Sequence, residues 1–182
     1  MALRLSALVA LPLALVFTPA LAAEDHRHHS PAASATPYAG LEARPIKALS
    51  AEDQAGLLAG QGMGMALAAE LNGYPGPRHV LDMADDLALS PHQRHQTSQA
   101  FDEMKGEATA LGSAVIAAEE ELDRLFASGS ATPTSVMDAT AKVAGLSGQL
   151  RALHLGYHLR MRAILSAEQV AIYNKLRGYS LN

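Results

Sequence analysis

The chain has no cysteine and no tryptophan, and only 4% of its 182 residues are aromatic. Without cysteine it can form no disulfide, even in an oxidising compartment, so apolar packing must hold the fold together. The formal net charge of −4 contains no basic excess, which argues against nucleic acid as a partner. The scarcity of aromatic side chains also disfavours base-stacking platforms and aromatic-lined substrate clefts.

Sequence motifs of catalysis are missing as well. No nucleophilic cysteine, no G-x-S-x-G pattern, no phosphate-binding glycine loop and no H-E-x-x-H pair occurs. Acidic runs such as Asp85-Asp86 and Glu119-Glu120-Glu121 have the pattern of solvated helix faces. We therefore predict that the protein is not an enzyme.

Residues 1–22 have the pattern of a cleaved secretory signal peptide. Arg4 precedes an apolar run over residues 5–16, and Ala20-Leu21-Ala22 forms a small-x-small cleavage site. The run is shorter than the roughly 20 apolar residues of a spanning helix, so we expect cleavage rather than anchoring. This pattern predicts export to the bacterial periplasm, with no membrane insertion after processing.

Composition divides the remaining chain into four parts. Residues 23–47, rich in Ala, Pro and His, predict a disordered arm and linker. Residues 48–77 predict short helices and a Gly- and Pro-rich loop. Residues 78–178 predict a helical domain, and residues 179–182 a short tail.

Two long heptad patterns predict an all-α fold. Apolar or small side chains recur at alternating spacings of four and three from Thr97 to Leu125, in a helix expected from Pro91 to about Ala127. A second pattern covers residues 136–164, after a loop around Ser130. Two such helices joined by a short loop predict a long antiparallel hairpin. Shorter helical patterns follow residue 50, cover residues 65–71 and 79–87, and follow residue 166.

A lone hairpin buries little surface relative to its volume. Either the short helices or a second copy of the chain must therefore cover it. Of these two arrangements we expect the homodimer, in which two hairpins form a cradle.

One five-residue pattern precedes two of the predicted helices. It reads Leu89-Ser90-Pro91-His92-Gln93 in the first copy and Leu165-Ser166-Ala167-Glu168-Gln169 in the second. Each copy predicts a capping box. In it the serine hydroxyl accepts a hydrogen bond from the backbone N–H of the glutamine three residues on, and the glutamine side chain accepts one from the backbone N–H of the serine. A degenerate third start has Ser50 followed by Asp53.

Two such motifs around a helical hairpin, behind a signal peptide, resemble the Spy/CpxP family of periplasmic proteins. That family has a repeated Leu-Thr-x-x-Gln motif, and here Ser90 and Ser166 replace threonine. The resemblance covers roughly residues 78–178 and implies a curved hairpin that dimerises. It implies ATP-independent, chaperone-like binding of unfolded envelope proteins, or contact with a membrane-bound sensor of envelope stress.

Two other functions stay open beside chaperone-like binding. The related CnrX and ZraP branch of the family implies periplasmic binding or sensing of transition metals in heavy-metal resistance. A structural adaptor that docks on a membrane partner is the third possibility.

Histidine placement supports the metal-binding alternative. His154 and His158 lie four residues apart on the second long helix, so their rings share a face and can hold one metal ion. His79 and Glu107 are candidate further ligands, because antiparallel packing sets Glu107 at the level of the pair. The alternative is that both histidines are flanking polar residues, hydrogen-bonded to nearby acids.

Other histidines give weaker candidates. The arm carries His26, His28 and His29, a tract able to scavenge metal. Cleavage after Ala23 would put His26 third from a free amine, a square-planar site for Cu(II) or Ni(II), whereas cleavage after Ala22 would spoil it. His92 and His95, in the first turn of a long helix, are expected at the surface. No cofactor is predicted to be required, and Zn(II), Cu(II) and Ni(II) are the candidate ions.

Overall fold

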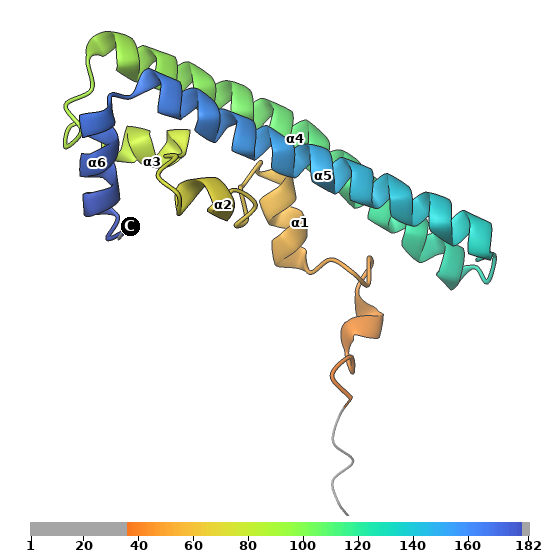
Figure 1. Ribbon diagram of the computed structural model, residues 1–182. Coiled ribbons are helices and arrows are strands. Elements are labelled where there is room, and N and C mark those ends of the chain that lie inside the picture. The colour runs from red at the N-terminus through yellow and green to blue at the C-terminus, as the bar shows by residue number, and fades with distance from the viewer. Residues whose placement is uncertain (1–35, 180–182) are drawn as a thin grey trace, which may run out of the picture. The chain divides into compact units, whose positions relative to one another are not determined.

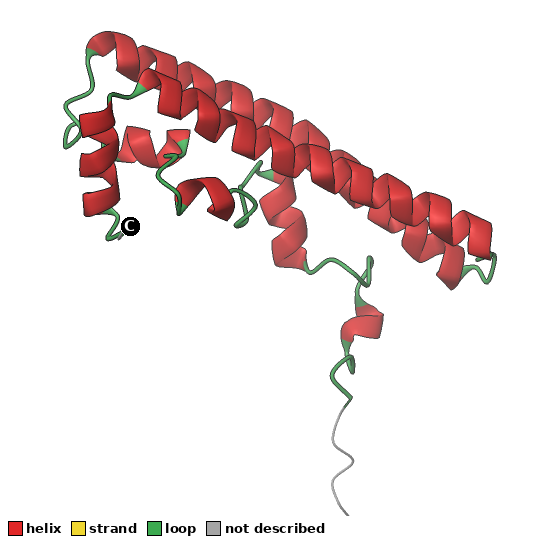
Figure 2. Ribbon diagram, in the orientation of Figure 1, coloured by secondary structure: helices red, strands yellow, loops and turns green. Residues whose placement is uncertain are grey.

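The computed structural model describes residues 36–179, which form α-helices joined by loops and contain no strand (Figure 2). The elements in chain order are a 3-10 turn (Leu41–Ala43), α1 (Ala51–Leu58), α2 (Leu67–Glu70), α3 (Pro77–Asp82), α4 (Pro91–Ala127), α5 (Pro133–Ile164) and α6 (Ala167–Leu176). The predicted all-α class and the long helical hairpin are confirmed.

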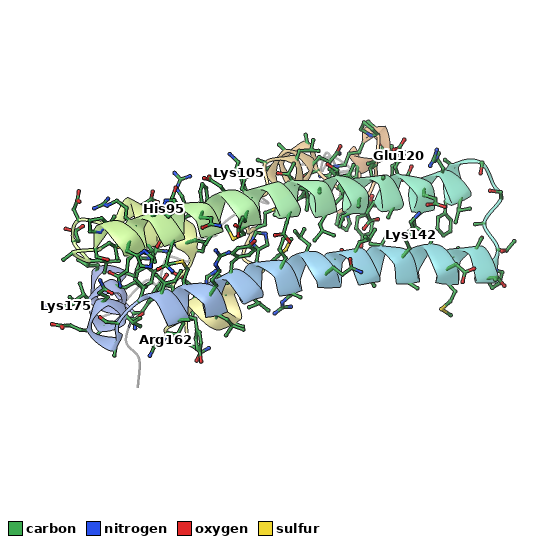
Figure 3. The ribbon with its side chains drawn as sticks, turned by 90° about the horizontal axis from the view of Figure 1, so that it is seen from above. His95, Lys105, Glu120, Lys142, Arg162 and Lys175 are labelled. Carbon is green, nitrogen blue, oxygen red and sulfur yellow. The ribbon has the colours of Figure 1, made fainter. Side chains whose placement is uncertain are left out.

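Helices α4 and α5 lie side by side along their whole length and form the hairpin (Figure 1). Heptad positions on both helices are buried, among them Thr97, Ala108, Val115 and Leu150. Seen from above, side chains fill the space between the two helices (Figure 3). Small residues such as Ala108 let the two backbones approach closely, as the heptad pattern requires.

Both predicted capping boxes are present. Ser90 accepts a hydrogen bond from the Gln93 backbone N–H, and Ser166 accepts one from that of Gln169. The two glutamine amides also bond each other, at 2.9 Å from Gln93 Nε2 to Gln169 Oε1 and 3.1 Å in the reverse direction. The repeated motif therefore ties the start of α4 to the start of α6.

The short helices pack against the hairpin. Helix α1 contacts α4, α2 contacts α5, and α3 contacts both long helices (Figure 1). One apolar core joins Val80, Leu89, Met161 and Tyr173, where α3 and α6 meet the hairpin. A second core joins Leu57 of α1 to Ala108, Val115 and Leu150. Residues 48–77 thus share the apolar core of the hairpin.

The end of the hairpin near its loop has a more open surface. Phe126 and Met137 are 62% and 71% exposed there. Of the α5 residues before Leu150, Ala139 is the buried one. Within residues 36–179 no helix combines the length and apolar character that crossing a membrane requires.

Candidate functional site

The two histidines of α5 are buried, in contrast to most of the polar residues of that helix. His154 is 2% exposed and His158 is 8% exposed. Both rings lie on a second inner face of α5, which the loops around α2 and α3 cover.

Glycines let the covering loops come close to the histidine rings. A Cβ atom at Gly76 would lie 3.0 Å from Cε1 and Nε2 of His158. One at Gly62 would lie 3.8 Å from Nδ1 of His154. Gly60 adopts a φ of +64° and packs so tightly on α4 that its Cβ would lie 2.7 Å from the Lys105 carbonyl oxygen. The glycine-rich segment therefore forms one wall of the histidine site.

A buried carboxylate lies next to the histidines. Glu70, at the end of α2, is 6% exposed and accepts hydrogen bonds on Oε1 from the hydroxyls of Tyr173 and Tyr179. His79 Nδ1 lies 3.5 Å from the same oxygen. Glu70 Oε2 has no hydrogen-bond partner in the described part of the chain and lies 3.7 Å from Nδ1 of His158.

The environment of Glu70 keeps it ionised. Burial alone would raise its pKa, but hydrogen bonds from His79, Tyr173 and Tyr179 outweigh burial and lower the pKa to about 2. Arg177 adds a positive charge, with its Nε 3.6 Å from Oε1. Glu70 is therefore a fixed negative charge at neutral pH, and burial together with its bond to Glu70 raises the pKa of Tyr173.

Hydrogen bonding determines which nitrogen of His158 is free. Its Nδ1 lies 2.7 Å from the carbonyl oxygen of Tyr74. A carbonyl can only accept, so Nδ1 carries the proton and donates it, which leaves the lone pair on Nε2. Metal-ligating histidines are commonly oriented by this kind of bond from the second ring nitrogen.

His154 also has an unused nitrogen. Its Nε2 is buried and has no hydrogen-bond partner within residues 36–179. Burial lowers the pKa of His154, and the neighbouring His158 lowers it further. The imidazole is therefore neutral at pH 7, the form in which it can bind a metal ion.

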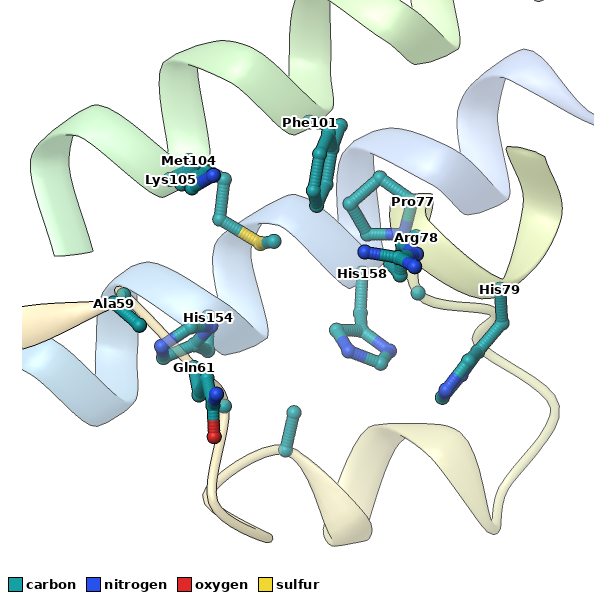
Figure 4. Close-up of a pocket in the computed structure, with 14 residues that line it drawn as sticks. Ala59, Gln61, Pro77, Arg78, His79, Phe101, Met104, Lys105, His154 and His158 are labelled. Carbon is teal, nitrogen blue, oxygen red and sulfur yellow. The ribbon is translucent and has the colours of Figure 1, made fainter. Parts of the chain in front are cut away.

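A cavity of about 380 Å³ joins these groups (Figure 4). His154 and His158 line it from α5, His79 lines it from α3, and Phe101 and Met104 line it from α4. The rings of His154 and His158 project into the space on either side of the Met104 side chain (Figure 4). A volume of this size can hold a metal ion or a small molecule.

Among the residues 36–179, no group of three or more His, Asp or Glu side chains has an arrangement that could hold a metal ion. The histidines of α5 therefore offer two donor atoms for a metal ion, the Nε2 atoms of His154 and His158. Any third ligand must come from a different type of group or from a side chain that moves.

The prediction that Glu107 joins this site was wrong. Glu107 is exposed on α4, does not line the cavity, and accepts a hydrogen bond at 2.7 Å from the Tyr157 hydroxyl. Burial and the bond to Glu107 raise the pKa of Tyr157 to about 12. Antiparallel packing does bring Glu107 level with this part of α5, but the α4 side chains that line the histidine cavity are Phe101, Met104 and Lys105.

The other predicted histidines fall into two groups. His79 lines the same cavity as His154 and His158, and its ring lies near Glu70. His92 and His95 are exposed in the first turn of α4, as expected. His26, His28 and His29 lie outside the described residues. Glu70 could not be predicted as part of the site, because a single glutamate between alanines and a leucine forms no motif.

No family model, no curated protein and no solved structure matches the chain. Its function must therefore be inferred from the cavity and from the motif resemblance.

Proposed function

We propose that this chain is a periplasmic transition-metal-binding protein in which His154 and His158 supply the first two ligands. One observation carries the proposal: two imidazoles that are at least nine-tenths buried line one cavity, and Nε2 of His154 is buried without a hydrogen-bond partner among the described residues. A buried polar atom without a partner costs about 1–3 kcal/mol, and a bound ion would remove that cost.

The surroundings of the histidines favour binding over catalysis. Tyr74 and Glu70 orient His158 from behind, in the manner of the outer ligand shell of metal sites. His79 is a further candidate ligand, since its Nδ1 side faces Glu70 and its other nitrogen is not hydrogen-bonded within the described residues. A bound ion would serve sensing, storage or resistance, as in the metal-binding branch of the Spy/CpxP family.

Isothermal titration of the processed protein with Zn(II), Cu(II) and Ni(II) tests the proposal. Replacing the arm histidines with alanine in every variant removes their contribution. We expect one ion per chain, and a loss of binding when His154→Ala is combined with His158→Ala. The matched control combines His92→Ala with His95→Ala, an exposed pair on α4 that should leave the affinity unchanged.

Circular dichroism separates loss of ligands from loss of fold. If the His154 and His158 variant is not folded, His158→Gln alone keeps a polar side chain of similar size and should still weaken binding. Unchanged affinity in a folded variant would show that the cavity histidines are not the ligands.

A second candidate function is chaperone-like binding of unfolded proteins. Between residues 58 and 71, four large apolar side chains are exposed, namely Leu58, Met63, Leu67 and Leu71. A cluster of exposed apolar residues is typical of a protein-binding surface.

Light scattering of an aggregating, chemically unfolded client without ATP tests this candidate. We expect the processed protein to suppress aggregation and Leu67→Lys to weaken the effect. Leu159→Lys, at an exposed leucine of α5, is the matched control and should change nothing. Absence of any suppression by the unmodified protein would exclude this function.

The homodimer stays a prediction. The exposed Phe126 and Met137 at the open end of the hairpin are apolar surface that a second copy could cover. Light scattering coupled to gel filtration should give twice the mass of the processed chain, and Phe126→Lys should lower it. A monomer at micromolar concentration would contradict the prediction.

A further inference from the structure

One of the side chains that line the cavity offers a sulfur atom, which is a softer metal donor than nitrogen or oxygen. Met104 of α4 is 8% exposed, and its thioether lines the cavity. In the close-up view the Met104 side chain extends from α4 into the cavity, above the rings of His154 and His158 (Figure 4). Together these residues offer two imidazole nitrogens and one thioether sulfur, all of them neutral donors.

The charges around the cavity bear on which ion it takes. Among the residues that the structure describes, no acidic side chain lines it, whereas Arg78 and Lys105 do. Arg78 is paired with Asp82 at 3.1 Å. The lining therefore brings no free negative charge toward a bound cation.

Glu70 does not supply the negative charge that the cavity lining lacks. Its carboxylate lies behind His158, on the Nδ1 side of the ring, and lines the neighbouring cavity. Arg177 already lies 3.6 Å from it. A divalent ion on these neutral donors would introduce two positive charges into a partly buried site, and a monovalent ion only one. Because uncompensated buried charge is costly, the site should bind a monovalent ion more tightly than a divalent one.

We propose that the preferred ion is monovalent copper, held by His154, His158 and the sulfur of Met104. This inference rests on the proposed metal-binding function and adds the identity of the ion and a third ligand. Thioether sulfur is a soft ligand that selects Cu(I), and imidazole suits copper as well. The inference also explains how a metal site can form with only two histidines. The third donor is a thioether, so no third His, Asp or Glu side chain is needed.

Met104 also has a structural role, because it is a buried apolar side chain of α4. Met104→Leu separates the two roles. Leucine keeps the volume and apolar character of the side chain at a cost below about 1.5 kcal/mol, but it lacks the sulfur. Met137→Leu is the matched control, at an exposed methionine of α5.

The experiment is an anaerobic competition titration of the processed protein, without arm histidines, against a chromophoric Cu(I) chelator. Zn(II) is titrated in parallel. We expect one Cu(I) per chain, at least about a tenfold loss of Cu(I) affinity in Met104→Leu, and no change in Met137→Leu. The affinity for Zn(II) should be the same in all three proteins. X-ray absorption at the copper edge should show a sulfur neighbour that disappears in Met104→Leu.

Two results would overturn the inference in distinguishable ways. Binding of Zn(II) at the histidine pair without Cu(I) binding, or an unchanged Cu(I) affinity in Met104→Leu, would refute the copper assignment and leave the metal-binding function intact. Failure of both ions to bind would refute the proposed function together with this inference.

Discussion

Adding one methyl group at Gly112 tests how closely α1 packs against the hairpin. Gly112 is buried on α4, and a Cβ there would lie 2.3 Å from the backbone oxygen of Leu57 and 2.8 Å from its carbonyl carbon. Neither atom belongs to a flexible side chain that could rotate away. In Gly112→Ala, α1 must therefore move off α4 and take Leu57 out of its core, where it is 5% exposed.

Gly106 provides a control on the same helix, because its Cβ would meet no atom within 4 Å. Replacing glycine with alanine inside a helix stabilises by roughly 0.5–1 kcal/mol at either position. This gain cancels when the two variants are compared. The difference that remains is the burial of Leu57, about 1.5–3 kcal/mol. We expect Gly106→Ala to be more stable than the unmodified protein, and Gly112→Ala to be less stable than Gly106→Ala by this amount.

Urea unfolding followed by circular dichroism at 222 nm measures both free energies of unfolding. Similar slopes against urea concentration would show that the variants unfold from equally compact states. If Gly112→Ala were as stable as Gly106→Ala, α1 could not pack against α4 as described, and the loop that covers the histidines would lose its anchor.

Three further predictions concern the interlocked motifs and the site. In a double-mutant cycle, Gln93→Ala and Gln169→Ala should show a coupling energy of at least about 0.5 kcal/mol by urea unfolding, and additive effects would contradict their mutual hydrogen bonds. The folded-state pKa of Glu70, about 2, lies below the ordinary 4.5, so the ionised group stabilises the fold above pH 4.5. About 3 kcal/mol should be lost as the pH falls from 4.5 to 2, and Glu70→Gln should lack this part of the pH dependence; an identical pH profile would count against the buried carboxylate. Gly76→Ala places a Cβ 3.0 Å from the His158 ring and should reduce Zn(II) affinity by about tenfold in titration. Full affinity in that variant would show that the ring position does not matter for binding.

The long helices could be predicted because their signals are local. Ser90 and Pro91 mark the start of α4, and the predicted end at about Ala127 agrees with the structure. Ser166 and Gln169 likewise mark the start of α6. A capping box and a heptad pattern depend on residues within one or two turns, so the sequence alone contains them.

The site could be predicted only in part, because it depends on contacts between distant segments. His154 and His158 share a helix, and their spacing was informative. Glu70 meets Tyr173 across 103 residues of sequence, and Tyr74 meets His158 across 84. No local pattern shows that the glycine-rich segment folds back on α5.

The same reason explains the error over Glu107. The register of a hairpin shows which residues of α4 and α5 lie at the same height along the helices. It does not show which face of α5 a given side chain lies on. Since α5 packs on α4 along one face and on the α2–α3 segment along another, the histidines belong to the second face. A residue on α4 at the same level, such as Glu107, then bonds Tyr157 instead.

Imidazole nitrogen NMR tests the metal-binding proposal most directly. Long-range 15N–1H spectra of the processed protein at pH 7 should show His158 protonated on Nδ1 with a free Nε2. One equivalent of Zn(II) should shift the Nε2 signals of His154 and His158 and leave those of His92 and His95 in place. A His158 protonated on Nε2, or zinc-induced shifts that spare the α5 pair, would contradict the account.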